Sequence, residues 1–255
     1  MTVIACYSNK GGVGKTAVAV NLAHALAEGG LRVLLCDLDP QGAAGFYVRV
    51  KPSSRLQDQV VFDDAKRIAG AIKGSDYDNL DILPATTALR DADLLLSQMK
   101  KGRSRLGKSL KAVDGDYDVI VLDCPPGLSA LSQTIFHAAD LILVPVIPTT
   151  LSERTFEQLL QIAGDDKDGA GTAMRKKIAA LFSMVQARKS LHGETMARMR
   201  DAHPKRFLSA TLPFSSDVER MGVHRAPILT FAARRPAAQA FLDLTGEVRA
   251  KLGIG

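Results

Sequence analysis

Short apolar runs alternate along the chain with longer segments in which apolar residues recur at every third or fourth position. The runs are rich in Val, Ile, Leu and Ala and predict strands near residues 2–7, 31–36, 80–85, 119–122, 139–146, 177–185 and 207–214. The periodic segments predict helices at residues 17–27, 56–72, 87–113 with a break near Gly102, from 152 onward, and 237–252. This alternation predicts an α/β protein with a doubly wound, mostly parallel sheet flanked by helices.

The chain is long enough to bury one complete α/β core. It has 255 residues, of which 46% are hydrophobic. No internal repeat, linker or change in composition divides it, so we expect a single domain over residues 1–255. No run reaches the roughly 20 apolar residues of a membrane span. Residues 1–7 enter the first predicted strand at once and do not resemble a signal peptide, so we expect a cytoplasmic protein.

A glycine-rich segment lies between the first predicted strand and the first predicted helix. Residues 10–16 read Lys-Gly-Gly-Val-Gly-Lys-Thr. Strand, glycine loop and helix is the context that a phosphate-binding loop requires, because glycine lets successive backbone N–H groups point at one anion. The helix N-terminus and Lys15 add positive charge, and the Thr16 hydroxyl can ligate Mg²⁺. The alternative is a glycine-rich turn with solvated lysines, which the flanking strand and helix argue against.

Carboxylates follow two of the predicted strands. The segment Asp37-Leu-Asp-Pro-Gln-Gly comes directly after residues 31–36, and Asp123-Cys-Pro-Pro-Gly follows residues 119–122. Ligands of open α/β sheets bind at the carboxyl ends of the strands. An aspartate at such a strand end is also where nucleotide-hydrolysing proteins hold Mg²⁺. The positions of Asp37, Asp39 and Asp123 therefore agree with a phosphate site at residues 10–16.

The glycine loop departs from the ordinary pattern at two positions. Asn9 stands where the first glycine is expected, and a second lysine, Lys10, lies inside the loop. In these features the sequence resembles the ParA/MinD superfamily of deviant Walker A ATPases, and among them the small ParA-type partition and positioning ATPases. The resemblance implies a P-loop NTPase fold and a slow, partner-stimulated, Mg²⁺-dependent ATP hydrolase. Pro125-Pro-Gly127 also resembles the switch loop of this family, which responds to the presence of the γ-phosphate.

The resemblance also implies roles for individual residues. Lys15 would hold the phosphates, Asp39 would position or activate the attacking water, and Lys10 would reach the nucleotide of the partner subunit across an ATP-dependent homodimer. The residues expected around Mg²⁺ are Thr16, Asp37 and Asp123. The expected ATP contacts lie in the glycine loop and in a later proline segment that would cup the adenine, and they are Gly11, Gly12, Val13, Gly14, Lys15, Thr16, Ala17, Pro213 and Phe214.

The charge of the chain adds a possible partner. The net charge is +6, and a basic protein of this kind suggests a polyanion. Basic residues are frequent in the last third of the sequence, as Arg188, Lys189, Arg198, Arg200, Lys205, Arg206, Arg220, Arg225, Arg234 and Arg235. Of these, the candidate contacts to non-specific DNA are Arg188, Lys189, Arg206, Arg220 and Arg225. Phosphate contacts need no base readout and weaken steeply with salt; for any single residue a solvated surface is the alternative. A second basic cluster at residues 100–111 is interpreted as a solvated helical face.

The resemblance implies a ParA-like ATPase that dimerises on ATP, binds DNA non-specifically and partitions or positions a cargo. The cargo would be a plasmid, a chromosome or a protein cluster, and hydrolysis, stimulated by an adaptor protein, would release the complex from the nucleoid. A MinD-like membrane-cycling ATPase is the alternative, but residues 247–255 are a poor match to a membrane-binding amphipathic helix. A metallocluster protein would need paired cysteines, whereas Cys6, Cys36 and Cys124 form no Cys-x-x-Cys pair.

Overall fold

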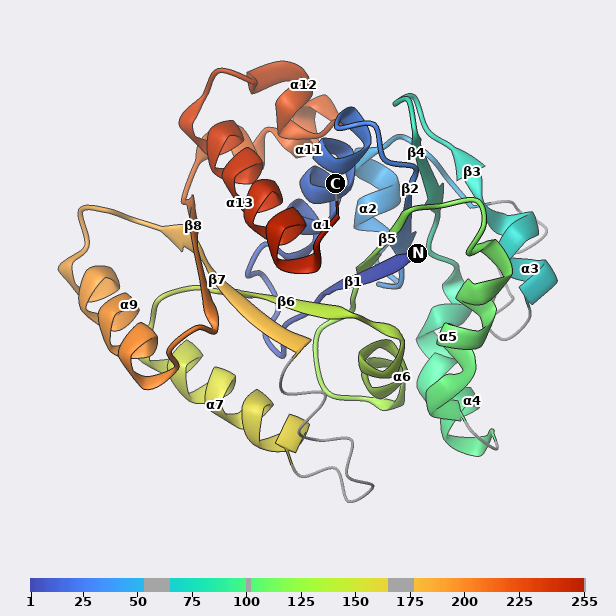
Figure 1. Cartoon of the computed structure of the whole chain (residues 1–255), viewed down its shortest axis with the longest axis horizontal. Helices are drawn as coiled ribbons and strands as arrows, with labels where there is room; N and C mark the ends of the chain where they lie inside the picture. The colour runs from blue at the N-terminus through green and yellow to red at the C-terminus, as the bar shows by residue number, and fades with distance from the viewer. Residues whose placement is uncertain (53–64, 100–101, 165–176, 255) are drawn as a thin grey trace.

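A central sheet organises the chain, and the computed structural model describes residues 1–52, 65–99, 102–164 and 177–254. Within these ranges the sheet has eight strands in the order β3-β4-β2-β5-β1-β6-β7-β8. Every neighbouring pair is parallel except β3 with β4. Helices lie on both sides of the sheet (Figure 1). The predicted doubly wound, mostly parallel sheet is confirmed.

The strands follow the predicted apolar runs closely. They are β1 Thr2–Cys6, β2 Val33–Asp37, β3 Lys73–Gly74, β4 Leu80–Leu83, β5 Val119–Asp123, β6 Leu141–Val146, β7 Ile178–Val185 and β8 Phe207–Pro213. Every residue of β2, β5 and β6 is buried, because helices cover both faces of a parallel sheet. The register aligns Cys6 with Asp123 and Asp123 with Asp37. Two acidic residues therefore lie side by side at the carboxyl edge of the central strands.

Two layers of helices cover the sheet. One face carries α1 Lys15–Glu28, α2 Ala43–Tyr47, α10 Ser216–Glu219, α11 Met221–His224, α12 Ile228–Ala232 and α13 Pro236–Leu252. The other carries α3 Ala65–Ala71, α4 Ala92–Gln98, α5 Arg105–Leu110, α6 Ala130–Ala138, α7 Thr150–Gly164 and α9 Ser190–Ala202. Each layer closes its own hydrophobic core against the sheet. None of these helices is both long and apolar enough to cross a membrane.

The predicted helix over residues 87–113 is broken into α4 and α5. Three short 3₁₀ turns flank these helices, at Thr87–Asp91, Gly102–Ser104 and Lys111–Val113. A side chain at Gly102 would collide with the carbonyl group of Leu96, so the chain turns there on a residue that has no Cβ atom. This confirms the predicted break.

Other predicted elements differ in extent. Of the predicted helix over residues 56–72, only α3 lies in the described ranges, and residues 53–64 lie outside them. The helix expected from residue 152 begins at Thr150. The hydrophobic pattern missed β3, α2, α6, α9 and the helices α10 to α12. Apart from α6 and α9 these elements have two to five residues, which is too short for a helical or alternating period to be visible.

Candidate active site

The loop between β1 and α1, residues 7–14, has the backbone shape of an anion cradle. Gly12 and Gly14 have φ angles of 72° and 90°, in the left-handed region that glycine adopts without strain. Gly14 caps the N-terminus of α1, and no side chain there bonds to the first helical N–H groups. A Cβ atom on Gly11, Gly12 or Gly14 would meet no other atom within 4 Å. Open space in front of the positive end of a helix fits a phosphate group.

Lys15 brings a buried positive charge to this cradle. The residue is 7% exposed, and its ammonium group donates a 3.4 Å hydrogen bond to the carbonyl oxygen of Lys10. Across the loop, the Ser183 hydroxyl of β7 donates a 2.9 Å hydrogen bond to the carbonyl oxygen of Val13. In the described ranges no carboxylate forms an ion pair with Lys15. Its remaining hydrogens are therefore available to an anion.

Asp37 and Asp123 form a buried acidic pair at the ends of β2 and β5. Their exposures are 1% and 0%. The Asp37 carboxylate accepts hydrogen bonds from the N–H groups of Gly45 at 2.9 Å and Asp39 at 3.3 Å. Neither oxygen of Asp123 has a hydrogen-bond partner of ordinary geometry, although the nearby Thr16 hydroxyl favours its charged form. Burial raises the pKa of both carboxyl groups, and the charge of Asp37 raises the pKa of Asp123 further.

This acidic pair fits a divalent cation. Two buried carboxylates, one of them with both oxygens unpartnered, form an unfavourable arrangement that a bound cation would relieve. Among the described residues, no three His, Cys, Asp or Glu side chains lie close enough to hold a metal ion by themselves. Mg²⁺ is often held by one or two carboxylates together with substrate phosphates and water. A site of Thr16, Asp37 and Asp123 beside a phosphate cradle has that composition.

Asp39 differs from its neighbour Asp37 in position. Its carboxylate accepts a 3.0 Å hydrogen bond from the N–H group of Gln41, and its carbonyl oxygen accepts the N–H group of Gly42 at 2.9 Å. This turn leaves Asp39 only partly buried, at the rim of the site. A partly solvated carboxylate at the rim can contact water, whereas the buried Asp37 faces the interior.

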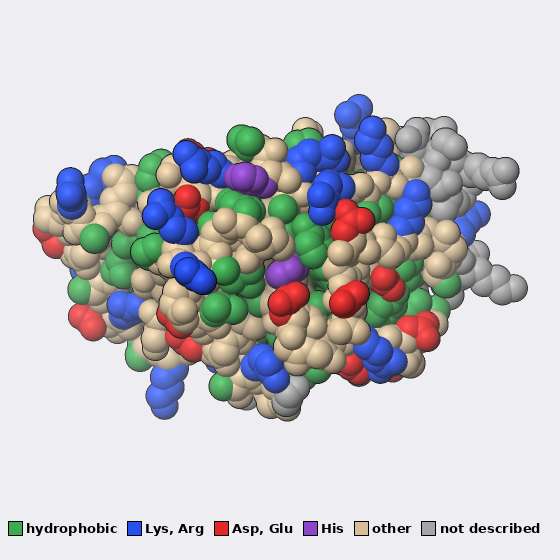
Figure 2. Space-filling view, turned by 90° about the horizontal axis from the view of Figure 1, so that it is seen from above, with side chains coloured by type: hydrophobic (Ala, Val, Ile, Leu, Met, Phe, Trp, Pro, Cys, Tyr) green, Lys and Arg blue, Asp and Glu red, His purple; other side chains and the backbone are tan. Residues whose placement is uncertain are grey.

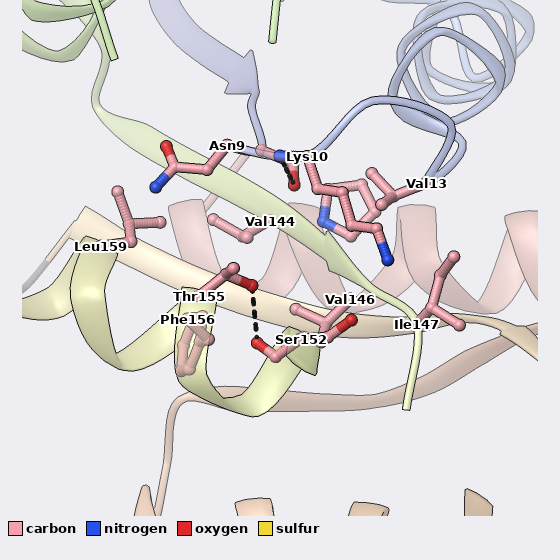
Figure 3. A pocket seen from close by; sticks show the side chains of 12 residues that line it. Asn9, Lys10, Val13, Val144, Val146, Ile147, Ser152, Thr155, Phe156 and Leu159 are labelled. Atoms are coloured by element: carbon pink, nitrogen blue, oxygen red, sulfur yellow. Dashed lines mark hydrogen bonds between the residues drawn. The ribbon is translucent and has the colours of Figure 1, made fainter. Parts of the chain in front are cut away.

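Lys10 lines a pocket that the sequence did not predict. The pocket lies between the glycine loop, the end of β6 and the first turns of α7 (Figure 3). Figure 3 shows the Lys10 side chain extending along it toward Ile147, with apolar Val146 and Phe156 also at its wall. Within the described ranges the Lys10 ammonium group has no hydrogen-bond partner. The pocket was missed because it joins residues 8–13 to residues 144–159, which no local pattern connects.

The two residues predicted to contact adenine lie at the carboxyl end of β8. Pro213 ends the strand, and Phe214 is 54% exposed. The N–H group of Phe214 donates a 2.9 Å hydrogen bond to the carbonyl oxygen of Val185 at the end of β7. Because β7 and β8 are parallel, this segment lies at the same edge of the sheet as the glycine loop. An adenine contact there stays a prediction.

The five candidate DNA contacts do not form one cluster. Arg188 and Lys189 follow the carboxyl end of β7, whereas Arg206 precedes β8 at the opposite edge of the sheet. Arg220 and Arg225 lie among the short helices between residues 215 and 235. Figure 2 shows Lys and Arg side chains concentrated along one edge of the face that it presents, with acidic side chains more frequent in the other half. DNA binding by these residues stays a prediction.

Two contacts tie the segment over residues 215–235 to the site. Asn21, fully buried in α1, accepts a 2.8 Å hydrogen bond from the N–H group of Ile228 and donates to Met221 Sδ at 3.2 Å. Arg225 donates a 3.3 Å hydrogen bond to the carbonyl oxygen of Phe46 in α2, and its guanidinium carbon lies 4.8 Å from the centre of the Phe46 ring. Sequence reasoning missed both contacts. A polar Asn21 within the apolar helix was the available signal.

Comparison with known proteins finds similar sequences and similar folds over most of the chain. A family model described as an AAA domain matches residues 1–169. The chain is 32% identical to the sporulation initiation inhibitor protein Soj of Bacillus subtilis, with 97% of this chain and 98% of Soj covered. It is 30% identical to the chromosome partitioning protein ParA of Caulobacter vibrioides, with 97% and 94% covered. Among solved structures, cobyrinic acid a,c-diamide synthase of Mycobacterium smegmatis with bound ADP and magnesium has a TM-score of 0.78 at 26% identity, with 99% and 97% covered.

Proposed function

Because the chain belongs to the ParA family of deviant Walker A ATPases, we propose that it is a ParA-like positioning switch. It binds MgATP, dimerises, binds the DNA of the cytoplasmic nucleoid without sequence preference, and releases this DNA after hydrolysis. The observation that carries the ATPase assignment is the convergence of a glycine cradle, a buried Lys15 and a buried Asp123 whose oxygens have no ordinary hydrogen bond within the described residues. We further propose that residues 1–255 form one domain, since helices from both ends of the chain pack on one sheet.

The chain's own groups divide the hydrolytic work. Bound MgATP supplies the γ-phosphoryl group and a divalent charge. The amides of residues 11–16 and the Lys15 ammonium group hold the phosphates, while Thr16, Asp37 and Asp123 supply oxygens around the cation. Asp39 at the rim orients the attacking water. Lys10, whose ammonium group has no hydrogen-bond partner among the described residues, reaches the partner subunit's nucleotide and neutralises charge in the transition state.

Dimerisation makes DNA binding depend on ATP. One copy offers Arg188 and Lys189 after the carboxyl end of β7 and Arg220 between α10 and α11, and their separate phosphate contacts are individually weak. Two copies held together by ATP engage the same duplex, so the second binding event becomes intramolecular and the affinity rises. An adaptor protein that stimulates hydrolysis then sets the lifetime of the complex. Its cargo would be a plasmid, a chromosome or a protein cluster.

Membrane cycling is less well supported. The apolar residues Phe241, Leu244 and Val248 of α13 are buried against α1 and the sheet. That helix therefore has no broad apolar face to place in a bilayer.

Binding to non-specific duplex DNA across a salt series tests the function. We expect tight binding with ATP, at least about tenfold weaker binding with ADP, and an affinity that falls steeply with salt. The variant Lys15→Ala is the control, because it should bind equally weakly in both nucleotides. Binding that does not depend on the nucleotide would contradict the proposal. Binding to anionic vesicles in place of DNA would support the membrane alternative.

A further inference from the structure

The hydroxyl group of Tyr7 joins two loops of the active site. Tyr7 follows β1 and is fully buried, with its ring edge-on to Phe136 of α6 at 4.6 Å between centroids. Its hydroxyl contacts the side-chain amide of Asn9 and the carbonyl oxygen of Gly127, the latter at 3.2 Å. Asn9 occupies the place of the first glycine in the phosphate loop, and Gly127 belongs to the loop after β5. A phenylalanine would fill the same space, so packing alone does not require the hydroxyl.

The chemistry of this hydroxyl suits a permanent link. Burial raises the pKa of Tyr7 far above its usual value, so the group stays protonated and remains a donor. A hydroxyl has one hydrogen and two acceptor positions. It either shares its hydrogen between the two partners or donates it to Gly127 while the Asn9 amide, rotated by 180°, donates to the hydroxyl oxygen. Both arrangements connect the phosphate loop to the loop after β5.

The carbonyl that is held belongs to a peptide plane with little to restrain it. Gly127 has a φ angle of 92° and no side chain, so its backbone rotates at low cost. In a planar trans peptide the C=O of Gly127 and the N–H of Leu128 point in opposite directions. Holding the carbonyl therefore also sets the direction of the Leu128 N–H group, which lies in the segment that follows Asp123.

We propose that Tyr7 is a positioning residue that fixes the loop over residues 125–128 against Asn9. The backbone of this loop, including the Leu128 N–H group, is thereby already oriented before the γ-phosphate binds. The effect on hydrolysis rests on the proposed function, whereas the link between the loops is a property of the folded chain. The departure at Asn9 from the ordinary phosphate-loop pattern thus acquires a purpose: it provides an amide that glycine lacks.

The variant Tyr7→Phe tests the link, because it removes one oxygen and keeps the ring. In hydrogen exchange of the nucleotide-free protein, we expect the Cys124 and Ser129 amides, which donate hydrogen bonds on either side of this loop, to exchange about fivefold faster, because local opening of the loop costs less once one ordinary hydrogen bond is lost. In steady-state ATPase assays, we expect kcat to fall about fivefold while KM for MgATP changes by less than about twofold. Tyr117→Phe is the matched control, because it removes a hydroxyl that donates to Asp81 at 2.7 Å away from this site.

A second variant, Asn9→Gly, restores the ordinary pattern and removes the other end of the link. It should reproduce the faster exchange, and the double variant should exceed neither single variant. The proposal would be overturned if exchange were unchanged in Tyr7→Phe, or if kcat fell no further in Tyr7→Phe than in Tyr117→Phe. If the wild-type protein hydrolyses no ATP, the proposed function fails, and the exchange experiment still decides whether the hydroxyl holds the loop.

Discussion

The buried acidic pair predicts that Asp123→Asn stabilises the nucleotide-free protein. Asp123 is fully buried, and among the described residues neither of its oxygens has a hydrogen-bond partner of ordinary geometry. Burial and the neighbouring Asp37 raise its pKa well above the unfolded value. Folding therefore favours the protonated form of this carboxyl group, whereas the unfolded chain at neutral pH carries the carboxylate. Asparagine has nearly the same shape and needs no proton.

The magnitude follows from the cost of proton uptake. Each pH unit above an unfolded carboxyl pKa near 3.9 costs about 1.4 kcal/mol, up to about 4 kcal/mol at pH 7 for one group that stays neutral. The amide of asparagine is itself costly to bury, by about 1–3 kcal/mol. We expect a net gain of about 2 kcal/mol in the free energy of unfolding, or roughly 4–8 °C in Tm for a chain of this size.

The sign of the pH dependence separates this cause from better packing. Because the folded pKa is raised, the stabilising contribution of the carboxyl group is complete below the unfolded pKa and is lost as pH rises toward the folded pKa. The gain in Asp123→Asn should therefore be large at pH 7.5 and absent or reversed near pH 4.5, where proton uptake costs less than burying the amide. Thermal unfolding at both pH values measures it, with Asp201→Asn, at an exposed position, as the control. A lower Tm at pH 7.5, or an equal gain at both pH values, would refute this reasoning.

Three further substitutions test the roles assigned to the site residues. Lys15→Ala should weaken ATP binding by about 100-fold in equilibrium titration, because it removes a buried charge from the phosphates; retained affinity would contradict the phosphate-loop assignment. Asp39→Ala should keep ATP affinity but lower kcat by at least about 100-fold and lengthen the life of the ATP dimer in gel filtration; normal turnover would remove Asp39 from its role. Lys10→Ala should lose the ATP-dependent dimer in sedimentation and lower kcat by about 1000-fold, and an unchanged dimer would rule out a lysine acting in trans.

The central strands, the glycine loop and the aspartates at the strand ends could be predicted from local sequence patterns. Parallel strands align their carboxyl ends, so aspartates after two apolar runs were expected to meet, and Asp37 and Asp123 are paired in register. Gly12 and Gly14 were expected in conformations that glycine favours, and both have positive φ angles. In each case the physical cause acts over a few residues or through the sheet.

Contacts between distant segments could not be predicted in this way. Tyr7 meets Gly127 across 120 residues, and Asn21 meets Ile228 across 207. No periodicity marks such pairs, because Gly127 belongs to a loop and Ile228 to a helix too short to show a hydrophobic face. The charge of Arg225 suggested a DNA contact, but a guanidinium group binds a carbonyl oxygen and an aromatic ring equally well. The sequence shows that Arg225 is charged but does not show which groups its side chain contacts.

The contacts of Asn21 and Arg225 have a common consequence for the switch. Asn21 belongs to α1, which begins at the phosphate loop, and Phe46 belongs to α2, whose Gly45 N–H group holds the Asp37 carboxylate. The basic segment over residues 215–235 therefore rests on two helices that start at the nucleotide site. If either helix moves, that segment must move with it or lose contacts. Asn21 is buried, so water cannot replace its hydrogen bonds to Ile228 and Met221. Arg225 is in this respect part of the support of the basic surface, and Arg220, for which no such contact is seen in the described ranges, is the more accessible of the two for a phosphate.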